Sequence, residues 1–68
     1  MFWKLRGLIR AQYVTQEAFA EALGISAATL NYKLNGKREF TVREMKKAIA
    51  LLGIDKADVY DVFFESIV

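Results

Sequence analysis

Residues 16–35 read QEAFAEALGISAATLNYKLN, and the spacing of residues in this stretch is the clearest structural signal in the chain. Apolar residues recur at helical spacing on both sides of a Gly-Ile-Ser tripeptide, which predicts two helices, 16–23 and 27–35, joined by a three-residue turn. Helices that cross steeply need a small residue at the crossing, a residue that tolerates positive φ in the turn, apolar filling and a cap. The residues that meet these demands are Ala20, Gly24, Ile25, Leu30 and Ser26.

Three further helices are predicted outside this stretch, near 2–12, 42–52 and 56–64, with no proline and no clean strand alternation between them. Glycines that follow apolar stretches match the left-handed residue that closes a helix, and capping side chains precede the stretches. Glu44 lies three residues after Thr41, which is the spacing of a capping box. The closing glycines are Gly24, Gly36 and Gly53, and the capping residues are Thr15, Ser26, Thr41 and Asp55. The prediction is an all-α domain of five helices.

The 68 residues are predicted to form one domain, 1–68, with slightly over half of them apolar. Helical spacing also selects the core. The predicted core residues are Leu5, Leu8, Ile9, Phe19, Ala20, Leu23, Ile25, Leu30, Leu34, Val42, Met45, Ile49 and Leu52. Gly7 interrupts the first helix at a cost of about 1 kcal/mol relative to alanine. It either permits a close helix approach or has no role.

Composition narrows the classes of function. Cysteine and histidine are both absent, which excludes disulfides and the usual Cys/His zinc sites, so we expect no metal and no cofactor. No apolar run reaches the roughly 20 residues of a membrane span, and we expect a soluble cytoplasmic protein with no membrane partner. The acidic residues are scattered over the helix faces, so neither an enzyme nor a small-molecule ligand is expected.

Charge is distributed unevenly along the chain. Residues 1–47 hold nine basic and four acidic side chains, a balance of +5, whereas residues 48–68 hold one and four, a balance of −3. An excess of positive charge over residues 1–47 suits a protein that binds phosphate with one face. The alternative, which composition supports equally, is that these are ordinary solvated surface charges.

The segment around the two central helices resembles the lambda-repressor-like domains of phage repressors, Cro proteins and related bacterial regulators. The resemblance covers residues 5–54. It is carried by Thr15-Gln16-Glu17, Phe19-Ala20, Leu23-Gly24-Ile25-Ser26, Thr29-Leu30, Asn35-Gly36-Lys37 and Leu51-Leu52-Gly53-Ile54. It implies a five-helix lambda-repressor-like domain whose helix-turn-helix binds double-stranded DNA, with helix 27–35 in the major groove. The implied function is transcriptional regulation of the phage type, as a repressor or Cro-like protein.

One face of helix 27–35 is predicted to read bases. It lies opposite the apolar Leu30 and Leu34 and carries Ala27, Ala28, Asn31 and Tyr32. The family places base readers at the positions of Ala27, Ala28 and Tyr32. The two alanines offer only apolar contact with thymine methyl groups, or are helix-forming filler. Asn31 is able to bond an adenine edge, and Tyr32 to reach a base or a phosphate.

Phosphate contacts are predicted around this face. Gln16 begins a helix, where free amides favour an anion, and the family grips the DNA backbone with the loop after helix 27–35. The predicted residues are Gln16, Thr29, Lys33, Asn35, Lys37, Arg38 and Arg43. In many family members an ion pair joins the positions of Ile9 and Leu34, so we expect these two apolar side chains to touch in the core.

The C-terminal segment, 55–68, carries more aromatic surface than one core needs. Tyr60, Phe64 and Ile67 share a face that is predicted to form a homodimer, and residues 65–68 either extend the helix or form a short strand. Phe2 and Trp3 are predicted to be exposed in the same way; alternatively, all these aromatics pack into the core. The rival function is a protein-interaction module, antirepressor- or antitoxin-like, that keeps the helix-turn-helix shape.

Overall fold

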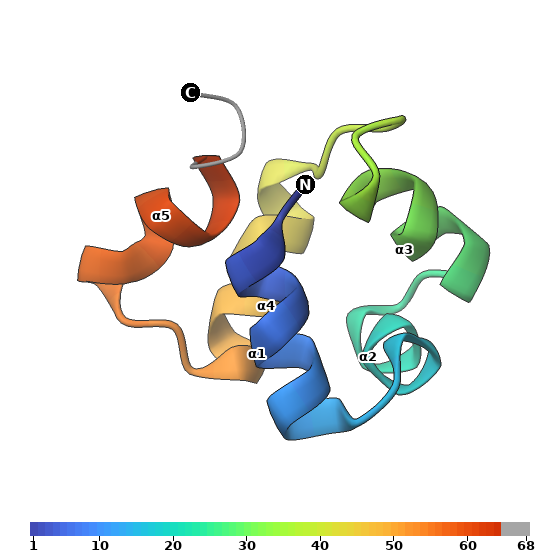
Figure 1. Ribbon diagram of the computed structural model, residues 1–68, viewed down its shortest axis with the longest axis horizontal. Coiled ribbons are helices and arrows are strands. Elements are labelled where there is room, and N and C mark those ends of the chain that lie inside the picture. The colour runs from blue at the N-terminus through green and yellow to red at the C-terminus, as the bar shows by residue number, and fades with distance from the viewer. Residues whose placement is uncertain (65–68) are drawn as a thin grey trace.

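Helices make up most of the described chain, residues 1–64, in the computed structural model of the protein (Figure 1). In chain order they are α1 (Trp3–Tyr13), α2 (Gln16–Leu23), α3 (Ala27–Leu34), α4 (Val42–Leu52), the 3₁₀ helix η1 (Lys56–Asp58) and α5 (Val59–Phe64). Within residues 1–64 there is no strand, which confirms the all-α prediction with five α-helices. The predicted last helix begins as a 3₁₀ turn. The choice between helix and strand at 65–68 lies outside the described residues.

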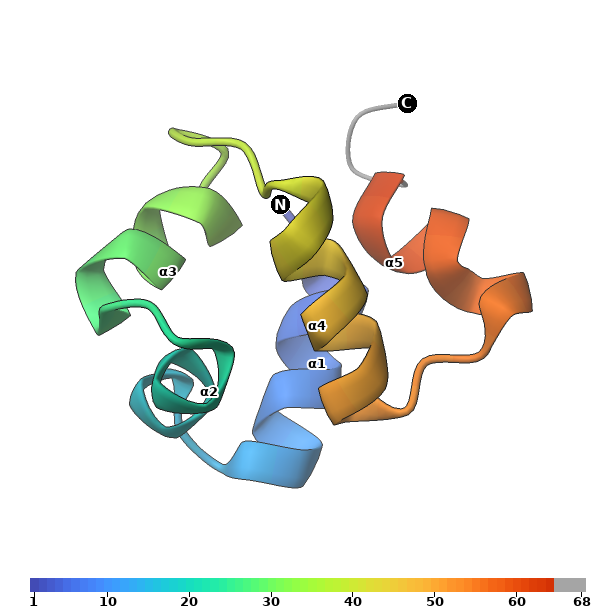
Figure 2. The ribbon, with the colours of Figure 1, turned by 180° about the vertical axis from the view of Figure 1, so that it is seen from behind.

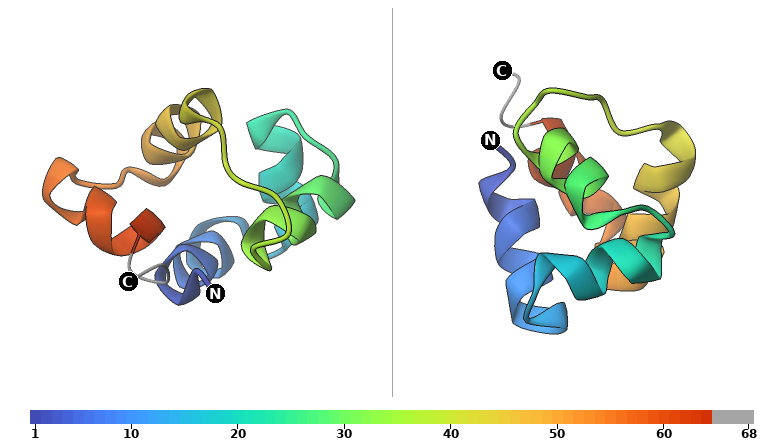
Figure 3. Two further views of the ribbon diagram at one scale, coloured as in Figure 1. Left: turned by 90° about the horizontal axis from the view of Figure 1, so that it is seen from above. Right: turned by 90° about the vertical axis from the view of Figure 1, so that its right-hand side faces the viewer.

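The helices α1 and α4 stand in the middle of the molecule (Figures 1 and 2). The pair α2–α3 lies on one side of them and α5 on the other, as the view from above also shows (Figure 3). α1 contacts α2, α4 and α5, and α2 contacts α3 and α4. Consequently α3 and α5 occupy opposite ends of the domain, and α3 keeps an outward face.

Local hydrogen bonds set the helix starts, largely as predicted. The side chains of Thr15, Ser26 and Thr41 accept hydrogen bonds from the backbone three residues on, and Thr41 and Glu44 form the complete capping box. Asp55 is a correction, because its side chain makes no cap bond: the chain enters η1 through its backbone carbonyl, which accepts from the Asp58 N–H at 2.8 Å.

The link between α1 and α2 is a tight turn with no signal in the sequence. Val14 has φ 71° and ψ −50°, and the Thr15 N–H donates to the Tyr13 carbonyl at 2.7 Å. This is the γ-turn with positive φ, which is strained for a β-branched residue. The Thr15 cap and the edge-on contact of Tyr13 with Phe19, 5.2 Å between ring centroids, hold the chain on both sides of it.

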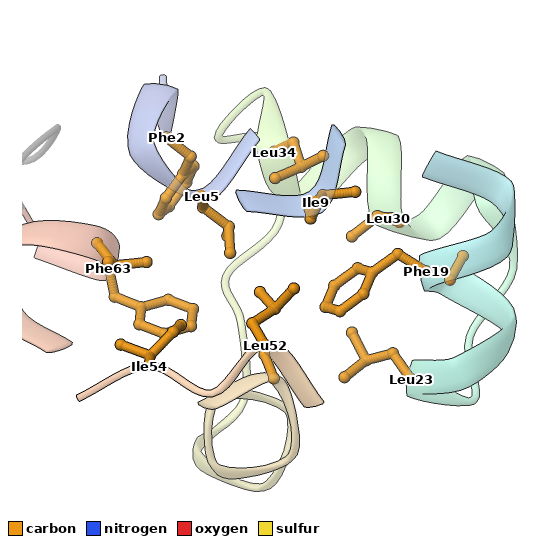
Figure 4. Packing of buried hydrophobic residues seen from close by; sticks show 13 residues of the cluster. Phe2, Leu5, Ile9, Phe19, Leu23, Leu30, Leu34, Leu52, Ile54 and Phe63 are labelled. Carbon is orange, nitrogen blue, oxygen red and sulfur yellow. The ribbon is translucent and has the colours of Figure 1, made fainter. Parts of the chain in front are cut away.

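A single buried cluster joins all five α-helices (Figure 4). Its members are Phe2, Leu5, Ile9, Phe19, Ala20, Leu23, Leu30, Leu34, Ala48, Leu52, Ile54, Val62 and Phe63. Leu8, Ile25, Met45 and Ile49 are half-buried against it. Ile9 and Leu34 both belong to the cluster, at 2% and 0% exposure; their direct contact stays a prediction.

The core prediction for Val42 is wrong. Val42 is 63% exposed, because it is the first residue of α4, directly after the cap; the buried residues of α4 are Leu52, as predicted, and Ala48. Phe2 is buried, as in the alternative that placed these aromatics in the core, with its ring edge-on to Phe40 at 5.4 Å between centroids. Trp3 is exposed, as predicted.

Gly7 lies inside α1 on the exposed side, and a Cβ added there would meet no atom within 4 Å. The close-approach interpretation of this glycine is therefore wrong.

We expect Gly7→Ala to raise the free energy of unfolding by about 0.5–1 kcal/mol, since alanine loses less backbone entropy. Thermal unfolding followed by circular dichroism measures this as a rise in Tm of roughly 4 °C. The matched control is Gly24→Ala, where φ is +87° and Tm should fall; an unchanged Tm for Gly7→Ala would contradict the prediction.

Candidate nucleic-acid interface

The outward face of α3 carries the four residues predicted to read bases. Ala27, Ala28, Asn31 and Tyr32 are all exposed, while Leu30 on the opposite side is fully buried. The face is therefore flat and sparse at its N-terminal end, and its polar groups lie toward the C-terminal end of the helix.

The end of α3 carries a cluster of one ring and two cations. The Lys37 Nζ and the Arg38 Cζ lie 5.9 and 5.7 Å from the centroid of the Tyr32 ring. Gly36 takes φ +76°, and the Lys37 N–H then donates to the Tyr32 carbonyl at 2.8 Å, so the chain turns back over the end of α3. This Tyr32 cluster (Tyr32, Lys37, Arg38) places two positive charges beside the exposed face, as phosphate binding requires.

A row of polar side chains connects α1 with this end of α3. The Arg6 Nη2 donates to the Asn35 Oδ1 at 2.8 Å and to the Leu34 carbonyl at 3.0 Å, and the Asn35 Nδ2 donates to the Asn31 Oδ1 at 3.2 Å. Arg6 was not among the predicted site residues, because it lies 29 residues before Asn35 and only the fold brings them together. Asn35, predicted to bind phosphate, is thus already bonded through both of its polar atoms.

Lys33 is a correction to the predicted phosphate contacts. Its ammonium donates to the Glu44 Oε1 at 2.6 Å and to the Glu39 carbonyl at 3.1 Å, and the residue is only 6% exposed. The ring of Phe40 lies 5.9 Å from the same Nζ. α4 and the loop before it enclose this lysine, so it ties α3 to α4 and is not presented to a phosphate.

The carboxylate of Glu44 serves both this ion pair and the capping box of α4. Burial alone would raise its pKa. The hydrogen bonds from Lys33 and Thr41, together with the Lys33 charge, outweigh burial and hold the pKa of Glu44 below its ordinary 4.5.

The lowered pKa of Glu44 makes stability depend on pH. Because the folded-state pKa lies below the unfolded one, this stabilisation is complete above about pH 4.5 and is lost as pH falls through the folded value. We expect the free energy of unfolding to decline on acidification below pH 4.5, and Glu44→Gln to decline less steeply there. Urea denaturation between about pH 3 and 7 measures both; parallel curves for the two proteins would contradict the assignment.

The remaining predicted phosphate residues lie on three different helices. Gln16 is half-buried at the start of α2 and lines a hollow of about 300 Å³ together with Arg6 and Arg10. The Thr29 hydroxyl accepts from the Ser26 hydroxyl at 2.8 Å, and Arg43 is exposed near the start of α4. Of the predicted phosphate residues, Lys37 and Arg38 lie against Tyr32 of the α3 face, and Asn35 is bonded to Asn31 of the same face.

A comparison with protein families matches residues 1–66 to DUF739, described as a protein of unknown function. The chain belongs to the DUF739 family. No curated protein matches it. The family match takes in α1 to α5 and every candidate base- and phosphate-contacting residue of this DUF739 protein, and it ends before Ile67.

The predicted dimer face of the DUF739 protein lies on α5. Tyr60 and Phe64 are exposed and pack against each other, with 5.7 Å between ring centroids, while Ile67 lies outside the described residues. The Lys4 ammonium lies 3.6 Å from the Asp61 carboxylate and links this helix to α1. The face is at the end of the molecule away from α3 (Figure 1).

Residues 1–64 contain no group of three or more acidic, histidine or cysteine side chains able to hold a metal ion. None of the helices in the same part of the chain is both long and apolar enough to span a membrane.

Proposed function

We propose that the protein is a sequence-specific double-stranded DNA-binding protein that regulates transcription in a bacterial cytoplasm. In this proposal α2, the turn 24–26 and α3 form a lambda-repressor-like helix-turn-helix, and α3 enters the major groove. The observation that carries it is the Tyr32 cluster beside the exposed face of α3. The protein is not an enzyme in this proposal.

The geometry of α3 suits a groove-binding helix. Leu30 and Leu34 are fully buried, so the helix is anchored along one side, while the side chains on its other side are exposed. A major groove about 12 Å wide admits one such helix. Lys37 and Arg38 would then meet phosphates, which position the protein, and Asn31 would meet a base edge, which carries sequence information.

The sparse reading face sets the expected specificity. Ala27 and Ala28 offer methyl groups only, which fit thymine methyls, and each good polar pair contributes about 1–3 kcal/mol of discrimination. We therefore expect a regulator with modest sequence preference, whose affinity for DNA depends strongly on salt concentration. The rival interpretation, a module that binds protein through the same face, is favoured by the same two alanines.

Selection from random duplex DNA tests the proposal. We expect enrichment of a short motif at low salt, and an affinity that falls steeply as salt rises. Absence of any duplex binding at low salt would overturn the proposal and favour the protein-interaction module, whose apolar contacts depend little on salt.

The regulator is further proposed to act as a homodimer through Tyr60 and Phe64 on α5. Two-fold dimers of such readers bind half-sites about 34–36 Å apart, and an exposed aromatic pair is a suitable contact. Sedimentation at high micromolar protein concentration should show a dimer, and Tyr60→Ser should return it to monomer. A monomeric wild-type protein would count strongly against this interface.

A further inference from the structure

We propose that Arg6, although it lies on α1, is a positioning residue for base recognition, acting through Asn35 on the amide of Asn31. The three side chains form a polar row that fixes which end of the Asn31 amide faces the groove. The inference rests on the proposed DNA binding and deepens it by naming the chemistry that the site reads.

The guanidinium of Arg6 is held at three points. Its Nε donates to the Met1 carbonyl at 2.8 Å, and its Nη2 donates to the Leu34 carbonyl and the Asn35 Oδ1 at 3.0 and 2.8 Å. Hydrogen bonds from a charged donor are roughly twice as strong as neutral ones. Arg6 is therefore a fixed reference against which the neighbouring amides orient.

The direction of the row follows from the chemistry of arginine. A guanidinium has donors only, so Asn35 must turn its oxygen toward Arg6. The Asn35 NH₂ group is then left on the side of Asn31. The Asn31 Oδ1 must therefore turn toward it and accept the hydrogen bond, at 3.2 Å. A free asparagine amide has no such preference, because its two ends exchange by rotation.

The outcome is an exposed Asn31 whose NH₂ group is the end left for a ligand. The acceptors of the major groove are the N7 of either purine, the O6 of guanine and the O4 of thymine, whereas cytosine presents an NH₂ donor. The site is accordingly specific for an acceptor-bearing edge and discriminates against cytosine at the contacted position. This sharpens the adenine-edge expectation for Asn31 to donation toward a purine N7 or another acceptor.

A double-mutant cycle separates this positioning role from a structural one. In the presence of Asn31, we expect Arg6→Met to lower affinity for the preferred duplex about 10-fold and to flatten base preference at one position. In an Asn31→Ala background, Arg6→Met should lower the affinity for the same duplex less than about 2-fold, since no amide remains to be oriented. Equal losses in both backgrounds would show direct phosphate contact or general destabilisation, and would overturn the inference.

Asn35→Asp provides a second variant that retains an acceptor for Arg6. The new carboxylate cannot donate to Asn31, so the Asn31 amide turns round, donates to it and presents oxygen outward. We expect base preference at the same position to move toward the donor edges of cytosine N4 or adenine N6. A preference profile identical to that of the wild type would overturn the inference, even if affinity falls.

A measurement without DNA keeps the two proposals distinguishable. The side-chain NH₂ resonances of Asn35 in the free protein should shift in both Arg6→Met and Asn31→Ala, and unchanged resonances would overturn the row itself. If these resonances shift but the wild-type protein binds no duplex, the polar row exists and the proposed DNA binding fails. The row then has no role in base reading, and the inference is overturned.

Discussion

Lys33→Met should lower the free energy of unfolding by about 3 kcal/mol, because it leaves the half-buried Glu44 carboxylate without its charged partner. The ammonium and carboxylate are 2.6 Å apart, with side chains only 8% and 17% exposed, so water replaces little of the lost interaction. The Glu39 carbonyl loses its donor as well. For a domain of this size such a loss is a large part of the total stability, and urea denaturation at neutral pH measures it directly.

The double variant Lys33→Met/Glu44→Gln is the control for this prediction. Glutamine is neutral and still serves a capping box, so removing both charges should recover at least half of the loss. A destabilisation below about 1 kcal/mol for Lys33→Met, combined with weaker DNA binding, would instead favour the phosphate contact that the sequence predicted for Lys33.

Lys37→Gln/Arg38→Gln should reduce affinity for duplex DNA by about 50-fold near 0.1 M salt, since each phosphate contact contributes close to one unit to the salt slope. We expect the slope of log K against log salt to decrease in magnitude by about 2, and the loss to be uniform across sequences. Both cations lie within 6 Å of the Tyr32 ring and belong to an exposed loop, so folding stability should barely change.

The matched control for the loop cations is Lys56→Gln, to be compared with Lys37→Gln. Lys56 is exposed in η1, which leads directly into α5, and α5 lies at the other end of the molecule from α3 (Figure 2). Lys56→Gln should leave the slope of log K against log salt unchanged, whereas Lys37→Gln alone should reduce the magnitude of this slope by about 1. An equal reduction for both variants would indicate non-specific attraction by net charge and contradict a localised phosphate contact.

Helix boundaries and most of the buried stripe were predictable because their causes are local. A threonine or serine caps amides only three residues away, as Thr15, Ser26 and Thr41 do, and a glycine closes a helix through its own φ. Local reasoning fails where a neighbour in space intervenes. Val42 fits an apolar stripe but is 63% exposed, and Phe2 is buried because Phe40 lies against it.

The candidate site divides in the same way. Exposure of Ala27, Ala28, Asn31 and Tyr32 followed from the buried positions of their own helix, since helical geometry relates the two faces. The fate of the charged side chains could not be predicted, because nothing within α3 distinguishes a lysine that is bonded to α4 from one that is free. The nearest charge to Lys33 comes from a residue 11 positions away.

The helical segments, their caps, the turn at Gly24 and the outward face of α3 thus followed from the sequence alone, because these depend on spacing and on hydrogen bonds within a few residues. Only the tertiary structure decided what the polar groups do. The fold brings Glu44 of α4 to Lys33, which becomes a buried, paired cation, and it brings Arg6 of α1 to the end of α3. The cause is physical: a charged side chain bonds to whichever acceptor or opposite charge lies within reach in space, and sequence distance does not limit that choice.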